Sequence, residues 1–109
     1  MRLQVILDEG VRTVEVPEEV LRDGEAFFAK IDADMDGGWQ MSRVWVETPD
    51  REQRCQIVAD RLLGALNTDN ELIAGLMAGY ILSRMPGVSA VEVDTSGDMT
   101  GTVFVGVTP

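Results

Sequence analysis

Histidine is absent from the chain and cysteine occurs once, and each scarcity excludes a class of functional site. Without histidine there is no Ser-His-Asp or Cys-His catalytic arrangement and no histidine-ligated metal. A lone cysteine forms neither an internal disulfide nor a cysteine-rich zinc site, and we expect Cys55 to be a buried, unreactive thiol. The 19 acidic residues leave a catalytic carboxylate pair open, but no spacing singles one out, so we expect a protein without enzymatic activity.

Basic residues are also scarce. Lys and Arg number 9 against 19 Asp and Glu, which gives a net charge of -10. Nucleic acids and anionic membranes bind positive surfaces, so we expect neither to be a direct partner. The charge instead favours a basic protein as partner. A weaker alternative is an acidic mimic of nucleic acid that occupies a DNA- or RNA-binding protein.

Long hydrophobic runs are missing as well. The longest apolar stretch, residues 72–82, is well short of the roughly 20 residues that span a bilayer. Residues 1–4 show no basic segment followed by an apolar one, so we expect no signal peptide and a cytoplasmic location. The 109 residues, of which 45% are hydrophobic, predict one globular domain over residues 1–109.

Strand patterns occur at both ends of the chain and helical patterns lie between them. Residues 2–16 and 90–105 each predict a β-hairpin. Helices are expected over residues 17–31, after Asp50 to about residue 66, and from a Thr68–Glu71 capping box to about residue 85. This order predicts the α+β class, with the two hairpins forming one antiparallel sheet of about four strands packed against three or four central helices.

The last of these helices carries small residues at a spacing that allows close helix contacts. Gly75 and Gly79 form a G-x-x-x-G pattern, and Ala74 and Ala78 lie beside them. Four small residues on adjacent rows let another helix approach closely. We expect a packing contact within the chain, with a homodimer interface as the alternative.

Three alternating aspartates followed by glycine stand directly after the first helical pattern. Asp32, Asp34 and Asp36 occupy positions 1, 3 and 5 of a twelve-residue pattern, and Gly37 occupies position 6. The stretch 32–43 resembles an EF-hand calcium loop, in which alternate residues turn oxygen atoms toward one cation. It departs from the family at position 12, where Arg43 replaces the bidentate glutamate.

The resemblance implies a metal site with a defined set of ligands. Its members would be the carboxylates of Asp32, Asp34 and Asp36, the carbonyl of Gly38, and Gln40 directly or through water. With Arg43 at position 12, only a weakly bound divalent cation is expected as a cofactor. The residues by themselves predict an acidic turn between helices, in which Asp34 or Asp36 caps the next helix and Arg43 pairs with an aspartate.

Both tryptophans lie in the same short segment as these aspartates. Segment 32–47 contains Trp39, Trp45 and four acidic residues, with Arg43 as its one basic residue. Tryptophan is enriched at interface hot spots, although core packing is its more common role. The sequence therefore predicts an adaptor or interaction protein that binds a basic partner through segment 32–47. Trp39, Arg43, Trp45 and Glu47 are the expected contact residues, and a Ca²⁺-binding protein is the alternative.

Overall fold

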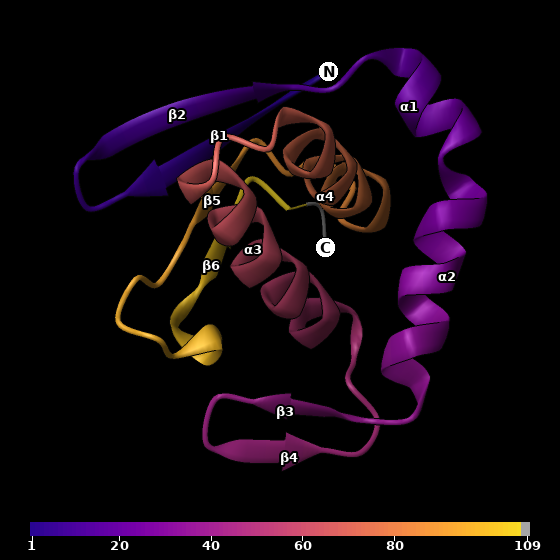
Figure 1. Cartoon of the computed structure of the whole chain (residues 1–109), viewed down its shortest axis with the longest axis vertical. Coiled ribbons are helices and arrows are strands. Elements are labelled where there is room, and N and C mark those ends of the chain that lie inside the picture. Colours follow the sequence, from indigo (N-terminus) through magenta and orange to yellow (C-terminus); the bar gives the residue numbers. More distant parts are fainter. Residues whose placement is uncertain (108–109) are drawn as a thin grey trace.

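Strands from the two ends of the chain form the main sheet of the computed structural model, which describes residues 1–107 (Figure 1). The strands β1 (Arg2–Leu7), β2 (Gly10–Glu15), β5 (Ala90–Glu92) and β6 (Val103–Val105) lie in the order β2-β1-β5-β6. The α+β prediction is confirmed, and each predicted hairpin forms an antiparallel pair. The prediction of a purely antiparallel sheet is wrong in one respect, because β1 and β5 are parallel. The helices that connect β1 to β5 make a connection long enough for the two strands to run in the same direction.

One face of the main sheet is apolar and is covered by two helices. Leu3, Val5 and Leu7 alternate along β1 with their side chains buried, and Val91 of β5 lies beside Val5 in the register. Helices α3 (Arg51–Asn67) and α4 (Glu71–Arg84) pack over this face (Figure 1). No helix covers the opposite face among the residues that the structure describes.

The first helical pattern forms two helices, not the single helix predicted over residues 17–31. Helix α1 (Glu18–Asp23) ends at Gly24, and α2 (Glu25–Asp36) begins there and continues past the predicted end. A Cβ atom at Gly24 would collide with the carbonyl oxygen of Val20, so the junction requires glycine. The break turns α2 so that Phe28, not Phe27, faces the core.

The two central helices begin at side-chain caps, of which the sequence predicted one. Asp50 caps α3, and its carboxylate and the Gln53 side chain form the reciprocal hydrogen bonds of a capping box. The predicted Thr68–Glu71 box is wrong, because Thr68 ends α3 and Asn70 caps α4 by accepting a hydrogen bond from the amide of Ile73. The 14 residues of α4 hold the longest apolar run, and no helix within residues 1–107 is long and apolar enough to cross a membrane.

Segment 39–46 forms a separate hairpin. Strand β3 (Trp39–Met41) pairs with β4 (Val44–Val46), and the hairpin lies at the far end of the molecule from α1 (Figure 1). The turn residue Ser42 adopts a positive φ of 57°. A short 3-10 helix, η1 (Met99–Gly101), lies between β5 and β6.

The two glycines of α4 have different surroundings, so the predicted helix contact is correct only at Gly79. A Cβ atom at Gly79 would lie 3.0 Å from the Phe28 ring and 3.5 Å from methyl carbons of Val16 and Val20. At Gly75 the same atom would meet nothing within 4 Å. Ala74 and Ala78 are buried. A homodimer contact on the open side of Gly75 stays a prediction.

We expect Gly79→Leu to lower the free energy of unfolding by about 1–3 kcal/mol, because the larger side chain overpacks the contact with Phe28. The matched variant Gly75→Leu should unfold no earlier than the parent, since leucine is the better helix former and has room there. Urea denaturation of the two variants tests this difference. Equal destabilisation by both would contradict the assignment of the contact to Gly79 alone.

Candidate functional site

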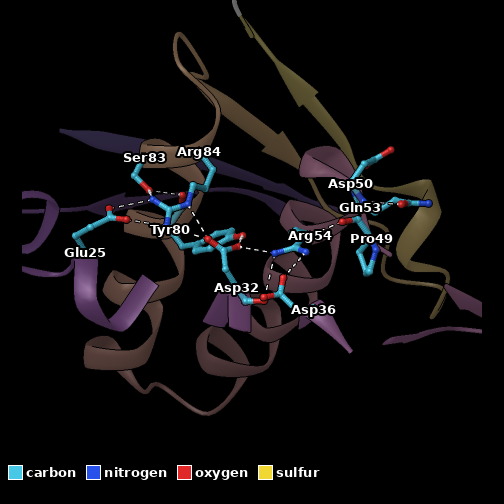
Figure 2. Close-up of polar contacts among 10 residues, drawn as sticks. All are labelled: Glu25, Asp32, Asp36, Pro49, Asp50, Gln53, Arg54, Tyr80, Ser83 and Arg84. Carbon is cyan, nitrogen blue, oxygen red and sulfur yellow. Dashed lines mark hydrogen bonds and ion pairs between the residues drawn. The ribbon is translucent and has the colours of Figure 1, made fainter. Parts of the chain in front are cut away.

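The carboxylate of Asp32 lies where α2, α3 and α4 meet, and it accepts hydrogen bonds from side chains of the other two helices (Figure 2). The hydroxyl of Tyr80 donates to Oδ1. Arg84 donates to Oδ2 from Nη2 at 2.9 Å and from Nε at 3.2 Å, and Arg54 Nη1 donates to Oδ1 at 3.3 Å. One carboxylate thus connects three helices.

Two arginines extend this arrangement to further acidic residues on α2. Arg84 forms a bidentate pair with Glu25, with both N–O distances at 3.0 Å, and Arg54 Nη2 lies 2.7 Å from Asp36. Arg54 also donates to the backbone carbonyls of Asp32 at 3.2 Å and Pro49 at 2.9 Å. We call Glu25, Asp32, Asp36, Arg54, Tyr80 and Arg84 the Asp32 cluster.

The contacts of the cluster shift the pKa values of Asp32, Tyr80 and Arg84. Burial alone would raise the pKa of Asp32, but hydrogen bonds from Tyr80, Arg84 and Arg54 outweigh it and keep the pKa below its usual value. Burial, together with the hydrogen bond to Asp32, raises the pKa of Tyr80, so the phenol stays protonated. The hydrogen bond to Glu25 raises the pKa of Arg84. The guanidinium of Arg84 also lies over the rings of Phe28 and Tyr80.

The first five of residues 32–43, which resemble a calcium loop, continue helix α2, so the predicted acidic turn is wrong from Asp32 to Asp36. On a helix, Asp32 and Asp36 share a face, and Asp34 projects away from them and is exposed. Arginines pair with the carboxylates of Asp32 and Asp36, which explains why the acidic stretch continues the helix. Within residues 1–107 no three or more acidic or cysteine side chains are grouped to hold a metal ion.

The other expected ligands and pairs are also placed differently. Gly38 has a positive φ of 99° and leads into β3, where the Gln40 side chain donates to the carbonyl of Ser42 at 3.1 Å. Arg43 is exposed and takes no part in the ion pairs of residues 1–107, so its predicted pairing with an aspartate is wrong. The cap of α3 is Asp50, not Asp34 or Asp36.

The tryptophans lie on opposite faces of the β3–β4 hairpin. Trp39 pairs with Val46 in the register and packs half-buried against the core, while Trp45 pairs with Gln40 on the outer face. Trp45 is 55% exposed. Its indole lies against Gly38, where a Cβ atom would collide with the ring. The indole is therefore supported on one side by backbone and open on the other.

A groove of about 580 Å³ lies beside the hairpin, between residues 41–44 and the loop at residues 96–100. Ser42 connects its two walls, because its hydroxyl donates to the carbonyl of Gly97 and accepts from the amide of Met99, each at 2.9 Å. Val44 lines this groove and is 59% exposed. The contact with a loop more than 50 residues away is long-range, and no local sequence signal indicated it.

Cys55 and Glu47, the remaining residues named from the sequence, lie in the core and on the surface respectively. Cys55 is buried as expected, and burial raises its pKa to about 12, so the thiol is protonated near neutral pH. Glu47 is exposed just after β4. No spacing in the sequence singles out Arg54, Tyr80 and Arg84. The one local sign of a buried partner for Asp32 is its position four residues after Phe28, at the edge of the buried face of α2.

Comparison of the chain with known protein families, with characterised proteins and with solved structures finds no match. Function is therefore inferred from the geometry and charge of the hairpin and of the Asp32 cluster.

We expect Asp32→Asn to lower the free energy of unfolding at neutral pH by about 2–3 kcal/mol, because the change removes charge-assisted hydrogen bonds to Arg54 and Arg84. The pKa of Asp32 is lowered on folding, so its contribution is complete above the unfolded pKa of about 3.9 and is lost as pH falls through the lower folded value. Urea titrations of both proteins from neutral to acidic pH measure the difference.

Asp34→Asn is the matched control, since Asp34 is exposed on the same helix. It should change stability by less than about 0.5 kcal/mol at every pH. An Asp32→Asn loss no larger than that of the control, or a loss that persists unchanged in acid, would contradict the assigned role of Asp32.

Proposed function

We propose that the protein is a non-enzymatic interaction protein that binds a basic segment of another protein through the outer face of its β3–β4 hairpin. We call Gln40, Arg43, Trp45 and Glu47 the hairpin surface. The observation that carries the proposal is the 55% exposure of Trp45. Tryptophan supplies a large contact area with few rotatable bonds, which makes it a frequent anchor of protein interfaces.

The contacts that hold Trp45 in place favour a role in binding a partner. The indole packs against the backbone of Gly38, and Trp39 and Met41 attach the inner face of the hairpin to the core. Ser42 fastens the turn to the loop at residues 96–100. An anchor held in place before binding loses little conformational entropy when a partner docks.

The charge near the hairpin favours a basic partner. Asp34 and Glu47 are exposed in the residues that precede and follow the hairpin, and the whole chain carries a net charge of -10. Acidic groups around an apolar anchor attract a basic surface, and the face of an indole binds guanidinium and ammonium groups. Arg43 at the turn would pair with an acidic group of the partner.

The alternatives receive less support. A divalent cation would compete for Asp32 and Asp36 with arginines that already neutralise them.

The two tryptophans have different roles in this proposal. Trp39 packs on the core, so we assign it a supporting role and Trp45 the role of anchor.

The experiment selects short peptides from a random display library on the wild-type protein and measures their affinities by calorimetry. We expect selected peptides to be rich in Lys and Arg and to bind more weakly as salt rises. Trp45→Ala should weaken binding about thirtyfold, which corresponds to roughly 2 kcal/mol.

Val44→Ala is the matched control, because Val44 is equally exposed on the same hairpin but on its other face. It should leave the affinity within about twofold. The proposal fails if selected peptides carry no excess of basic residues, or if Trp45→Ala, shown to be folded by circular dichroism, binds them as well as the parent does.

A further inference from the structure

The uncovered face of the main sheet carries apolar side chains where polar ones are the norm. The register places Val11, Ile6, Glu92 and Val103 in one row across all four strands, and Val105 follows in the next row. Val11 is 58% exposed, Val103 55% and Val105 45%. A sheet with one solvated face usually presents polar residues there, and a contiguous exposed apolar patch marks a contact surface.

The charges of this face are unevenly distributed. At one corner Arg2 and Glu15 pair across β1 and β2 at 3.2 Å and cancel each other. Glu92 lies in the middle of the face between Ile6 and Val103, and its carboxylate takes no part in the ion pairs of residues 1–107. The row of Val11, Ile6, Glu92 and Val103 is therefore apolar apart from the carboxylate of Glu92, and Gln4 and Thr13 form a polar strip between this row and the Arg2–Glu15 pair.

A pocket of about 290 Å³ adds further negative charge at the end of this face. Asp8, Glu92 and Asp94 line it together with Thr95 and Ser96. Asp8 lies just past the end of β1 and Asp94 just past the end of β5, and both line the pocket together with Glu92. The Thr95 hydroxyl donates to Asp8, and the Ser96 amide donates to Asp94 at 2.7 Å, which fixes both carboxylates at the rim.

We propose that this uncovered sheet face is a docking surface for an amphipathic helix of another protein that inserts a Lys or Arg side chain into the pocket of Asp8, Glu92 and Asp94. The apolar side chains of the helix would cover Ile6 and the three exposed valines. Helices are the elements that most often cover a sheet face. The surface shares no residue with the hairpin surface, so this proposal goes beyond the function proposed above.

Charge decides between this occupant and a second copy of the chain. Two copies joined by this face would bury two uncompensated Glu92 carboxylates in one interface, with a net charge of -10 on each chain. Like charges across an interface are strongly unfavourable, whereas a basic residue on a partner is attracted by the carboxylates of Asp8, Glu92 and Asp94, which form no ion pair within residues 1–107.

The test uses a synthetic helical peptide with Leu along one face and Lys at its other positions, titrated into the ¹⁵N-labelled protein. Saturable shifts of amide resonances in β1, β2, β5 and β6 are expected. Val103→Thr with Val105→Thr should weaken binding about tenfold, because threonine keeps the shape and strand preference of valine but is polar. Glu92→Gln should weaken it severalfold, and a peptide with Glu in place of Lys should not bind.

One control variant separates this surface from the rest of the molecule. Leu72→Ser removes an exposed apolar side chain of α4, outside both proposed surfaces, and should leave the affinity for the peptide unchanged. Shifts confined to the hairpin, equal binding by the acidic peptide, or no loss in the double threonine variant would each overturn the proposal. Concentration-dependent dimerisation that shifts the same strand resonances would overturn it in favour of a second copy.

Discussion

The position of α2 depends on the carboxylate of Asp32. Helix α2 buries only Phe28, Ile31 and Met35, so apolar packing on its own leaves its rotation and tilt weakly specified. The hydrogen bonds from Tyr80, Arg84 and Arg54 fix both, because a carboxylate that accepts from two other helices has a single arrangement that satisfies all its donors. The β3–β4 hairpin begins directly after Gly37 and Gly38, which follow α2. The contacts that position α2 therefore also position Trp45.

Local signals predicted most elements, and long-range contacts account for the errors. The Asp50 cap, the terminal hairpins and the burial of Cys55 follow from residues close in sequence. The acidic stretch at residues 32–36 has the composition of a turn, yet it is helical because Arg54 and Arg84 neutralise it from 18 to 52 residues away. The parallel pairing of β1 with β5 likewise has no local signature. Of the candidate site, the sequence predicted the segment around Trp45 but not the cluster that positions it.

The excess of acidic residues serves two physical roles. Some carboxylates, such as Asp32 and Glu25, bind the few arginines of the chain and join helices. Others, such as Glu47 and Glu92, stay free beside exposed apolar groups. Because Arg54 and Arg84 are used internally, the outer surface is poorer in positive charge than the composition suggests. Both proposed contact surfaces therefore favour partners that combine basic and apolar side chains.

The central claim is that Asp32 anchors a helix and is not part of a cation-binding loop. Backbone Cα chemical shifts of residues 31–37 in solution, recorded with and without millimolar Ca²⁺, test it most directly. If Asp32 anchors α2, the shifts are helical through Asp36 and adding Ca²⁺ leaves them unchanged. Shifts typical of a loop, or a saturable change on adding Ca²⁺, would contradict the claim.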